Sequence, residues 1–450
     1  MSNNHTIAAI DIGTTKIVAI VGTRDENGNV SVLGYGEAPS RGVIRGSVQN
    51  VGEVSAAIKQ AVKQCTESSG VVFKNVFVGI AGQNIRTKET SHKKFINTPF
   101  ITQADIDSLT QEVYGLSKGA GEEIIHVIPQ SYTVDGTSTN NAVGCSGKSL
   151  SGTFYVVIGS ADAVHKIRQA IDMAGLQTVK IVLQSIASGD AVLTNDDKEV
   201  GTLVADIGAG TTDVAIYQDK VLRSISVIPF GGNAITDDIK SACQILARQA
   251  ELLKIQHAAA IPDANADKTL VVVNGVGRSD REVSLADIAA IANARMDEIV
   301  AGIANALNES KYGDRISQIA ITGGGSRLRS LATLIKYRLD RGVEQMKPRN
   351  FSADANPNLY NVEYSTAVGL LVKGIEYMET YRESVKSSEN KTVEPKAQSA
   401  DTNNKGAEDA KDDAKKNTKT NKKSSGFLTK VKGWVDSLFA ESEDDENSKL

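Results

Sequence analysis

Residues 8–20 of this chain read AAIDIGTTKIVAI, and residues 203–216 read LVADIGAGTTDVAI. Both stretches place aliphatic residues on each side of an Asp-Ile-Gly step, which is typical of two strands joined by a tight turn. The aspartates of the two steps, Asp11 and Asp206, are 195 residues apart, and a further β-like run follows each copy. A chance likeness between two hairpins is the alternative. An internal repeat of this kind predicts two similar lobes that face each other across a cleft.

Each Asp-Ile-Gly turn has the residue types that bind a polyphosphate. A carboxylate ends the first strand, and the glycine lets the backbone approach a ligand closely. The threonines that follow offer N–H and hydroxyl donors to phosphate oxygens, while the G-x-x-x-x-G-K-[ST] pattern of P-loop proteins is absent. We expect Asp11 and Asp206 to hold Mg²⁺ through water, because Mg²⁺ keeps several of its waters. The candidate nucleotide ligands of the two turns are Asp11, Gly13, Thr14, Thr15, Lys16, Gly208, Gly210, Thr211, Thr212 and Asp213.

Two further glycine-rich segments add to this pattern. ITGGGSRL at residues 321–328 follows an aliphatic strand and precedes a helical pattern, and a helix N-terminus presents free N–H groups to a ligand. PFGGN at residues 229–233 is a second glycine-containing segment whose flexible backbone can approach a ligand. One glycine-rich turn is usually only a tight turn, but several in this order favour a nucleotide cleft. The candidate nucleotide ligands added here are Gly231, Gly232, Asn233, Gly323, Gly324, Gly325 and Arg327.

The composition excludes several classes of protein. The 450 residues carry 50 basic and 54 acidic side chains, and a net charge of −4 argues against a nucleic-acid binder. Three distant cysteines form neither a disulfide framework nor a metal pair. No apolar run is long enough for a transmembrane helix, and polar residues between Ile7 and Val21 exclude a signal peptide. We therefore expect a soluble, cytosolic protein of several domains.

Strand-like and helical patterns alternate from Thr6 to about Arg382, which is typical of an α/β fold. An Asn-Gly step at residues 27–28 predicts a hairpin turn, and helical spacing predicts a helix over residues 51–67. The predicted division is a first lobe in residues 1–86 and 152–200, a more polar inserted subdomain in 87–151, a second lobe in 201–382 with its outer subdomain at about 235–315, a disordered linker in 383–423, an amphipathic helix in 424–440 and an acidic tip in 441–450.

The polar linker ends in one amphipathic helix. The linker cannot bury enough apolar area to offset its chain entropy, whereas residues 424–440 separate apolar from polar side chains at about 100° per residue. Packing on the lobes, binding a partner's groove and lying in a membrane interface remain open, and neighbouring lysines favour the membrane. An anionic surface would repel the acidic tip, which nothing in the sequence explains. The candidate membrane-binding residues are Phe427, Leu428, Lys430, Val431, Lys432, Trp434, Val435, Leu438 and Phe439.

Together these motifs resemble the ATPase superfamily of actin, Hsp70 and the sugar kinases. Residues 11–16 look like its first phosphate motif, residues 206–213 like the second, residues 323–327 like the adenosine motif and residues 364–371 like the second connecting helix. Within the superfamily, the chain is most similar to the FtsA family of bacterial cell-division actin homologues. The likeness covers about residues 6–375 and returns at the C-terminal helix.

The resemblance implies an actin-like fold, with duplicated ribonuclease-H-type lobes around a nucleotide cleft and an inserted α+β subdomain. It implies ATP and Mg²⁺ as cofactors, with Glu251 and Lys254 beside the ribose and residues 231–233 near the nucleotide. It also implies filaments, a membrane-targeting helix, docking of the tubulin-like division protein FtsZ on the outer subdomain, and recruitment of other division proteins. The protein would lie on the cytoplasmic side of the cell membrane at the division site. Arginines there that can pair with a carboxylate, or are simply solvated, are Arg278, Arg281 and Arg295.

The first connecting segment departs from the superfamily pattern. It reads LQSIA at residues 183–187, where the superfamily often has a carboxylate in place of Gln184. Glutamine orients water by hydrogen bonds but cannot accept a proton as a base. We expect ATP binding with at most slow Mg²⁺-dependent hydrolysis, with Gln184 and Asp206 as candidate catalytic residues. A small-molecule kinase and an Hsp70-like regulator are the alternatives, and neither needs a membrane helix.

Overall fold

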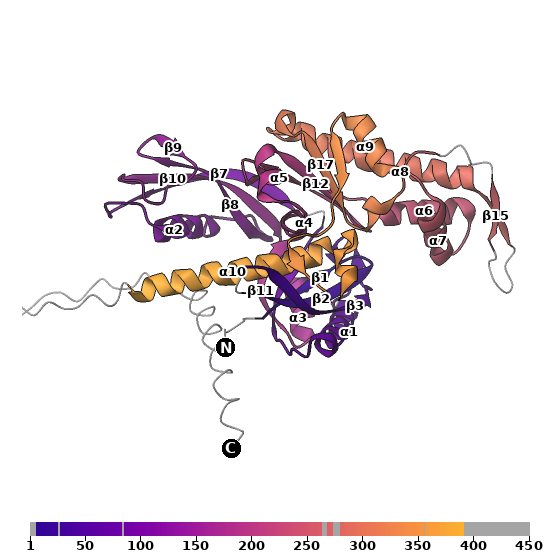
Figure 1. Cartoon of the computed structure of the whole chain (residues 1–450), viewed down its shortest axis with the longest axis horizontal. Helices are drawn as coiled ribbons and strands as arrows, with labels where there is room; N and C mark the ends of the chain where they lie inside the picture. Colours follow the sequence, from indigo (N-terminus) through magenta and orange to yellow (C-terminus); the bar gives the residue numbers. More distant parts are fainter. Residues whose placement is uncertain are drawn as a thin grey trace, which may run out of the picture. The chain divides into compact units, whose positions relative to one another are not determined.

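The structure is a computed structural model that describes residues 6–25, 28–82, 85–262, 268–272, 280–354 and 356–390, with side chains as far as residue 382. Two mixed sheets carry the site and have the same topology (Figure 1). In each sheet, three consecutive strands form an antiparallel meander, and two later strands add in parallel beside the first strand of the meander.

The first sheet has the strand order β11-β6-β1-β2-β3-β19. The predicted hairpin at residues 27–28 joins β2 to β3, although residue 27 itself lies outside the described residues. Its strands are β1 (Ile7–Ile12), β2 (Lys16–Arg24), β3 (Val30–Pro39), β6 (Asn75–Ile80), β11 (Gln177–Leu183) and β19 (Phe351–Ser352).

The second sheet has the order β14-β13-β12-β17-β18. Its meander begins at β12, which contains the second Asp-Ile-Gly step, so the internal repeat in the sequence corresponds to a repeat in the fold. Its strands are β12 (Thr202–Ile207), β13 (Thr212–Gln218), β14 (Val221–Ile228), β17 (Gln318–Thr322) and β18 (Gly342–Gln345).

The central strands β1 and β12 are buried at all six of their positions. Their unbroken aliphatic sequences suit a sheet that is covered on both faces, where alternation is not needed. In the first lobe, α1 (Val51–Ser69) packs on β2 and β3 with α3 (Ala161–Met173) beside it, and α10 (Ser365–Asn390) covers the other face. α1 is two residues longer than predicted and ends at Gly70 in the left-handed conformation, with φ of 71°.

A smaller four-stranded sheet, of order β7-β10-β8-β9, lies between β6 and α3 in the sequence. α2 (Gln103–Tyr114) covers one face of this sheet, with a core that includes Leu109, Leu150 and Phe154. The edge strand β7 has no buried residue, which contributes to the more polar sequence of this segment. Its strands are β7 (Arg86–Phe95), β8 (Glu122–Val134), β9 (Thr137–Thr139) and β10 (Ser149–Ser160).

Further elements build the outer part of the second lobe and the connections. The long helix α8 supplies much of the second lobe's core, through side chains such as Met296 and Ile299. The remaining helices are α5 (Asn195–Val200), α6 (Gly232–Cys243), α7 (Ala247–His257), α8 (Leu285–Glu309) and α9 (Leu331–Leu339), the remaining strands are β4 (Val43–Ile44), β5 (Ser47–Val48), β15 (Thr269–Val272) and β16 (Arg281–Ser284), and the 3₁₀ turns are η1 (Gly313–Arg315), η2 (Gly324–Arg327), η3 (Pro357–Tyr360) and η4 (Val362–Tyr364).

Two helices run between the lobes and cross each other. α4 (Gln184–Val192) connects β11 of the first sheet to the second lobe, and α10 leaves the second lobe and packs on β1, β2 and β6. At the crossing, a Cβ atom on Gly369 would lie 1.8 Å from the carbonyl oxygen of Ala187. Only glycine allows the two backbones to approach so closely.

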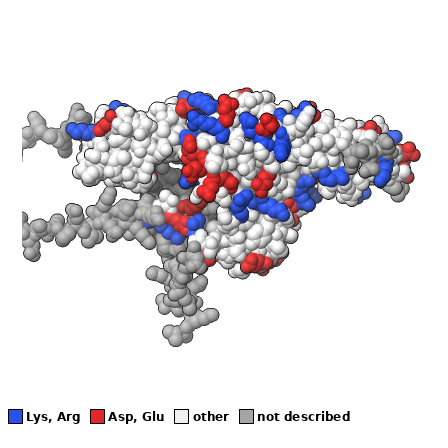
Figure 2. All heavy atoms as spheres, turned by 45° about the horizontal axis from the view of Figure 1, so that its top comes forward, with Lys and Arg blue, Asp and Glu red and all other residues white. Residues whose placement is uncertain are grey.

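On the face drawn in Figure 2, Lys and Arg side chains alternate with Asp and Glu side chains among the described residues, so this face does not form one continuous basic surface. Nucleic-acid binding usually requires a basic patch or stripe. Within the described part of the chain, none of the helices is both long and apolar enough to cross a membrane.

Candidate functional site

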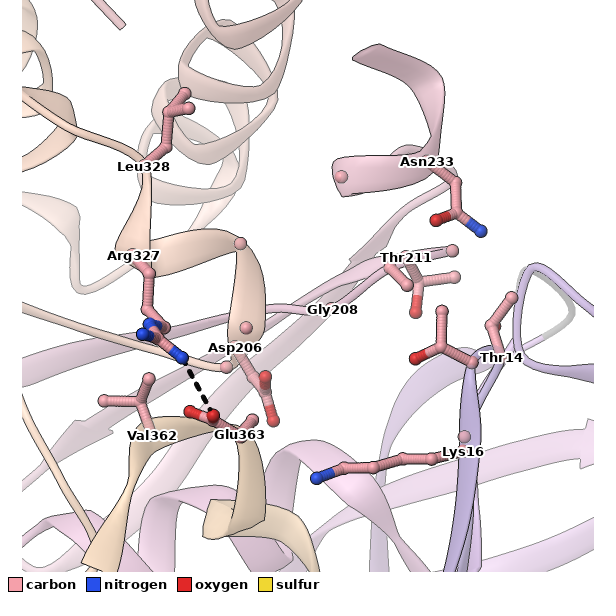
Figure 3. A pocket seen from close by; sticks show the side chains of 18 of the residues that line it. Thr14, Lys16, Asp206, Gly208, Thr211, Asn233, Arg327, Leu328, Val362 and Glu363 are labelled. Carbon is pink, nitrogen blue, oxygen red and sulfur yellow. Dashed lines mark hydrogen bonds and ion pairs between the residues drawn. The ribbon is translucent and has the colours of Figure 1, made fainter. Parts of the chain in front are cut away.

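A pocket of about 420 Å³ lies where the turns of the two sheets face each other. One Asp-Ile-Gly turn comes from each lobe, and the third glycine-rich turn, the start of α6 and part of α7 complete the walls (Figure 3). The predicted site residues that line the pocket are Asp11, Gly13, Thr14, Thr15, Lys16, Gln184, Asp206, Gly208, Gly210, Thr211, Asp213, Gly232, Asn233, Glu251, Lys254, Gly323, Gly324, Gly325 and Arg327.

The two Asp-Ile-Gly turns have the same length and the same closing hydrogen bond. The N–H of Gly13 donates to the carbonyl of Lys16 at 3.1 Å, and the N–H of Gly208 donates to the carbonyl of Thr211 at 2.9 Å. Lys16 in the first turn therefore corresponds to Thr211 in the second. The Thr-Thr pairs of the two copies, which look equivalent in the sequence, occupy different positions in the fold.

The same register continues into the second strand of each hairpin. Asp11 pairs with Val18 across the first hairpin, and Asp206 pairs with Asp213 across the second. Asp213 thus occupies the position that Val18 has in the first lobe. The hairpin of the second lobe brings two carboxylates to the pocket, whereas the hairpin of the first lobe brings one.

Two predicted ligands do not line the pocket. Thr212 is fully buried, and its hydroxyl donates to the carbonyl oxygen of Phe230 at 2.9 Å. Gly231 packs against the second turn, because a Cβ atom there would lie 2.5 Å from the carbonyl oxygen of Gly208. Both residues therefore pack against the second turn on the side away from the pocket.

Three buried carboxylates give the pocket its electrostatic character. Burial, with a contribution from the charge of Asp206, raises the pKa of Asp11 to about 7, although Lys16 opposes the shift. Burial and the same charge raise the pKa of Asp213 to about 7. Burial also raises the pKa of Asp206, against hydrogen bonds that favour its charged form. The three carboxylates therefore bind a proton more readily than a solvated carboxylate does, and a cation bound beside them would favour their charged forms.

The donor set fits a hydrated cation better than a directly ligated one. Among the described residues, no three His, Cys, Asp or Glu side chains lie close enough together to coordinate one ion. The Oδ1 atom of Asp213 is nevertheless buried without a hydrogen-bond partner. Mg²⁺ usually keeps several waters and needs only one or two carboxylates, so Asp11 and Asp206, with Asp213 beside them, match that requirement.

Lys16 is the cation of the first turn. Its ammonium lies 3.6 Å from a carboxylate oxygen of Glu37 and 3.3 Å from the centre of the Tyr364 ring. The Tyr364 hydroxyl in turn donates to Glu37 at 2.8 Å. Burial lowers the pKa of Lys16, although three carboxylates raise it in part. Lys16 has therefore already lost much of its hydration before an anionic ligand binds beside it in the pocket.

Gln184, the first residue of α4, touches the first turn. Its side-chain amide donates to Asp11 Oδ1 at 2.9 Å. An amide holds a carboxylate or a water in place but does not remove a proton. The geometry therefore suits orientation by Gln184, and its role toward an attacking water stays a prediction.

The third glycine-rich turn packs directly on the second Asp-Ile-Gly turn. A Cβ atom on Gly323, whose φ is 80°, would clash with Asp206 Oδ1. Instead of the expected helix N-terminus, the turn forms the short 3₁₀ helix η2, and α9 begins only at Leu331. Arg327 reaches from this turn to Glu363 at 3.0 Å (Figure 3).

A charged pair from α7 borders the opposite wall. Lys254 lies 2.7 Å from Glu251, and its ammonium also donates to the carbonyl oxygen of Gly232 at 3.2 Å. The hydroxyl of Thr236 on α6 donates to the Glu251 carboxylate. Apolar side chains lie next to this pair and could cover a flat ring, namely Ile235, Ile255, Met296 and Leu328.

Comparisons with known proteins agree with this architecture. A family model described as "Cell division protein FtsA" matches residues 203–369, and one described as "SHS2 domain inserted in FTSA" matches residues 82–158. The cell division protein FtsA of Neisseria meningitidis serogroup B is 33% identical over 369 residues, which cover 81% of this chain and 89% of that protein. The chain belongs to the FtsA family.

A second relative supports the family, and solved structures support the fold. FtsA of Pseudomonas aeruginosa is 32% identical over 395 residues, covering 87% of this chain and 94% of that protein. The PilM-PilN type IV pilus biogenesis complex contains a chain with a TM-score of 0.61 at 15% identity, covering 82% of this chain and 98% of that one. MreB5 of Spiroplasma citri bound to ADP has a TM-score of 0.50 at 13% identity, covering 85% and 98%. These likenesses show that the fold is actin-like, as expected.

The arginines predicted to bind a partner have different surroundings in this FtsA-family chain. Arg295 is held by Asp238 and Glu298, each at 2.6 Å. Arg281 on β16 donates to the side chain of Gln244 at 2.8 Å. Arg278 lies outside the described residues, as do the predicted amphipathic helix, the acidic tip and the predicted linker from residue 391 on. Residues 383–390, which were predicted to belong to the disordered linker, instead continue helix α10.

Two residues that contact Asp206 in this FtsA-family chain were not predicted from the sequence, namely Thr366, which lines the pocket, and Ser188, which is fully buried. Ser188 and Thr366 donate to Asp206 Oδ2, the threonine at 3.0 Å. Ser188 follows Gln184 by four residues on α4, so helical spacing could have indicated that both face the same side. No local pattern singles out Thr366, which comes from α10.

Proposed function

We propose that this chain is an ATP-binding, polymerising, actin-like adaptor that tethers the FtsZ division ring to the inner face of the cytoplasmic membrane. Membership of the FtsA family supports a role in cell division. The observation that carries the nucleotide part is the pocket between the two Asp-Ile-Gly turns, which contains the buried carboxylates of Asp11, Asp206 and Asp213. Recruitment of other division proteins belongs to the same proposal.

In this proposal the triphosphate lies between the turns. The N–H groups of Gly13 and Gly208 close the two turns, so the backbone N–H groups of Thr14, Thr15, Ala209 and Gly210 would face the phosphate oxygens. Lys16 would exchange part of its contact with Glu37 for a phosphate. Mg²⁺, held by Asp11 and Asp206 through water, would screen the phosphate charge. Asp213 adds charge to the same hydration shell. Glu251 and Lys254 would bond the ribose hydroxyls.

Hydrolysis in this site would be slow. Gln184 can orient a water but cannot accept its proton. A small-molecule kinase would need a carboxylate base beside its substrate, and the amide of Gln184 occupies the corresponding connecting segment. We therefore assign nucleotide binding, with at most slow turnover, to this pocket.

Nucleotide binding is tested with the purified full chain and a fluorescent ATP analogue. We expect tight binding with Mg²⁺ and clearly weaker binding in EDTA. Equal binding in the two conditions would remove the metal from the proposal, and no binding at all would remove the nucleotide.

Membrane attachment is assigned to the predicted helix in residues 424–440. We expect a chain that ends at residue 423 to lose most of its binding to vesicles that contain phosphatidylglycerol, by at least about tenfold, because one amphipathic helix supplies the apolar contact. Flotation of the full chain, the shortened chain and Trp434→Glu measures this, with Trp434→Phe as the matched control. Unchanged flotation of the shortened chain would overturn the anchor.

The same vesicles test the partner. FtsZ should float with the full chain and sediment with the shortened one. Arg281→Glu tests whether FtsZ docks on the outer subdomain. Lys220→Glu makes the same change of charge in the turn between β13 and β14, outside that subdomain, and serves as the control. If FtsZ floats equally well with Arg281→Glu, its docking surface does not include this arginine.

A further inference from the structure

One carboxylate oxygen in the pocket receives hydroxyl groups from both helices that run between the lobes. Ser188 on α4 donates to Asp206 Oδ2, and Thr366 Oγ1 on α10 lies 3.0 Å from the same oxygen. The two hydroxyl oxygens are also 2.9 Å from each other. Three different elements, α4, β12 and the distant α10, therefore meet at one atom.

The other oxygen of Asp206 is restrained as well. Oδ1 lies against the backbone of Gly323, where a Cβ atom would clash with it. Asp206 itself is 8% exposed, and Ser188 is fully buried. The carboxylate consequently has one orientation, which the hydroxyls fix at Oδ2 and the third glycine-rich turn fixes at Oδ1.

Both hydroxyls sit on the crossing of the helices that connect the lobes. Gly369, three residues after Thr366, meets Ala187, the neighbour of Ser188, at the closest approach of α10 and α4. A rotation of one lobe against the other must change this crossing, because each helix is attached to both lobes. It would then also change the two hydrogen bonds to Asp206.

We infer that Ser188 and Thr366 are positioning residues, which aim the Asp206 carboxylate at the hydrated cation and link cation binding to the crossing of α4 and α10. This inference rests on the proposed nucleotide site. A structural role alone would only require that the hydroxyls satisfy each other. The bonds to Asp206 show that they are directed at the one carboxylate shared by the second turn, the third turn and the pocket.

The arrangement predicts redundancy between the two hydroxyls. Each hydroxyl has one hydrogen, so either Ser188 or Thr366 can keep a donor on Oδ2 when the other is lost. Ser188→Ala and Thr366→Val should each have a modest effect, and the double variant should have more than the sum of both. Such coupling between neighbours is what a double-mutant cycle measures.

The readout is the ratio of nucleotide affinities with Mg²⁺ and in EDTA, measured on the full chain. We expect the double variant to lower this ratio by about tenfold, which is typical for loss of hydrogen bonds to a charged group, while affinity in EDTA stays the same. Thr366→Ser, which keeps the hydroxyl, should bring the ratio back to that of the Ser188→Ala single variant when it is combined with Ser188→Ala. A general packing defect would lower both affinities together.

Matched controls separate positioning from folding. Ser55→Ala removes a buried serine hydroxyl that has no hydrogen-bond partner, and Thr380→Val removes a hydroxyl that bonds only to its own helix α10. Both should leave the ratio unchanged. If the double variant unfolds, Thr366→Val is compared with Thr366→Ser as single variants, because this position is only partly buried; Thr366→Val should then lower the ratio modestly and Thr366→Ser should leave it unchanged.

The two proposals fail in different ways. If the wild-type chain binds nucleotide equally with Mg²⁺ and in EDTA, or not at all, the proposed cation site is wrong whatever the variants do. If wild-type binding depends on Mg²⁺ and the double variant keeps the wild-type ratio, the positioning role of Ser188 and Thr366 is overturned while the nucleotide site stands.

Discussion

Asp213→Asn should stabilise the protein without ligand at neutral pH, by on the order of 3 kcal/mol, and weaken its binding of Mg²⁺ and ATP by at least about tenfold. Asp213 is buried, Thr211 donates to one of its oxygens, and the other oxygen has no partner. Asparagine keeps the shape and the bond from Thr211 but carries no charge. The variant therefore separates the effect of the buried charge on stability from its effect on the binding of Mg²⁺ and ATP.

The pH dependence has a definite sign. Burial raises the pKa of Asp213 from its ordinary value of 3.8 to about 7, so the folded state binds this proton more tightly than the unfolded state does. The stability that the protonated group contributes is present below pH of about 4 and is lost as the pH rises to about 7. As the pH rises from about 4 to about 7, the free energy of unfolding of the wild type should fall relative to that of Asp213→Asn. Above pH of about 7 the difference between the two proteins should stay constant.

Urea unfolding of both proteins between pH of about 4.5 and 8 measures this difference. Asp172→Asn, an exposed aspartate on α3, is the control and should run parallel to the wild type. Parallel curves for Asp213→Asn would mean that the buried carboxylate does not hold its proton in the folded state. Saturating Mg²⁺ and ATP should stabilise the wild type by more than the variant, because a ligand adds stability in proportion to its affinity.

The sequence predicts the sheets of this fold well because each depends on local signals. The meander β1-β2-β3 requires only aliphatic runs, an Asp-Ile-Gly turn and an Asn-Gly turn, and all of these lie within residues 7–39. The repeat then predicts the second sheet from the first. Most of the predicted pocket residues meet because the carboxyl ends of parallel strands β1 and β6, or β12 and β17, lie at one edge of each sheet.

What the sequence does not predict depends on contacts between distant segments. Asp213 looks like part of a Thr-Thr-Asp run until the register of β12 and β13 places it opposite Asp206. Ser188 and Thr366 are 178 residues apart, and only the crossing of α4 and α10 brings them together. The third turn becomes a 3₁₀ helix because Gly323 and Gly325 must pack on the second turn, which no propensity anticipates.

That crossing carries the prediction with the largest effect on stability. Gly369→Ala should destabilise the protein by at least about 3 kcal/mol, since its Cβ atom would lie 1.8 Å from a backbone oxygen of α4 and 2.3 Å from the carbonyl carbon. A side chain could turn away, but this backbone cannot move unless α4 and α10 separate. Separation would pull Thr366 and Ser188 from Asp206, so Mg²⁺-dependent nucleotide binding should fall with stability.

Gly52→Ala is the matched control, because Gly52 lies in α1 with its nearest neighbouring atom at 3.5 Å. There alanine should be neutral or stabilise the helix by up to about 1 kcal/mol, as the better helix former. Thermal unfolding and nucleotide titration of both variants distinguish the two sites. Equal unfolding temperatures for the two variants would show that the crossing tolerates a side chain. The two helices could then separate without loss of stability, and a rotation of the lobes would not be linked to the hydrogen bonds at Asp206.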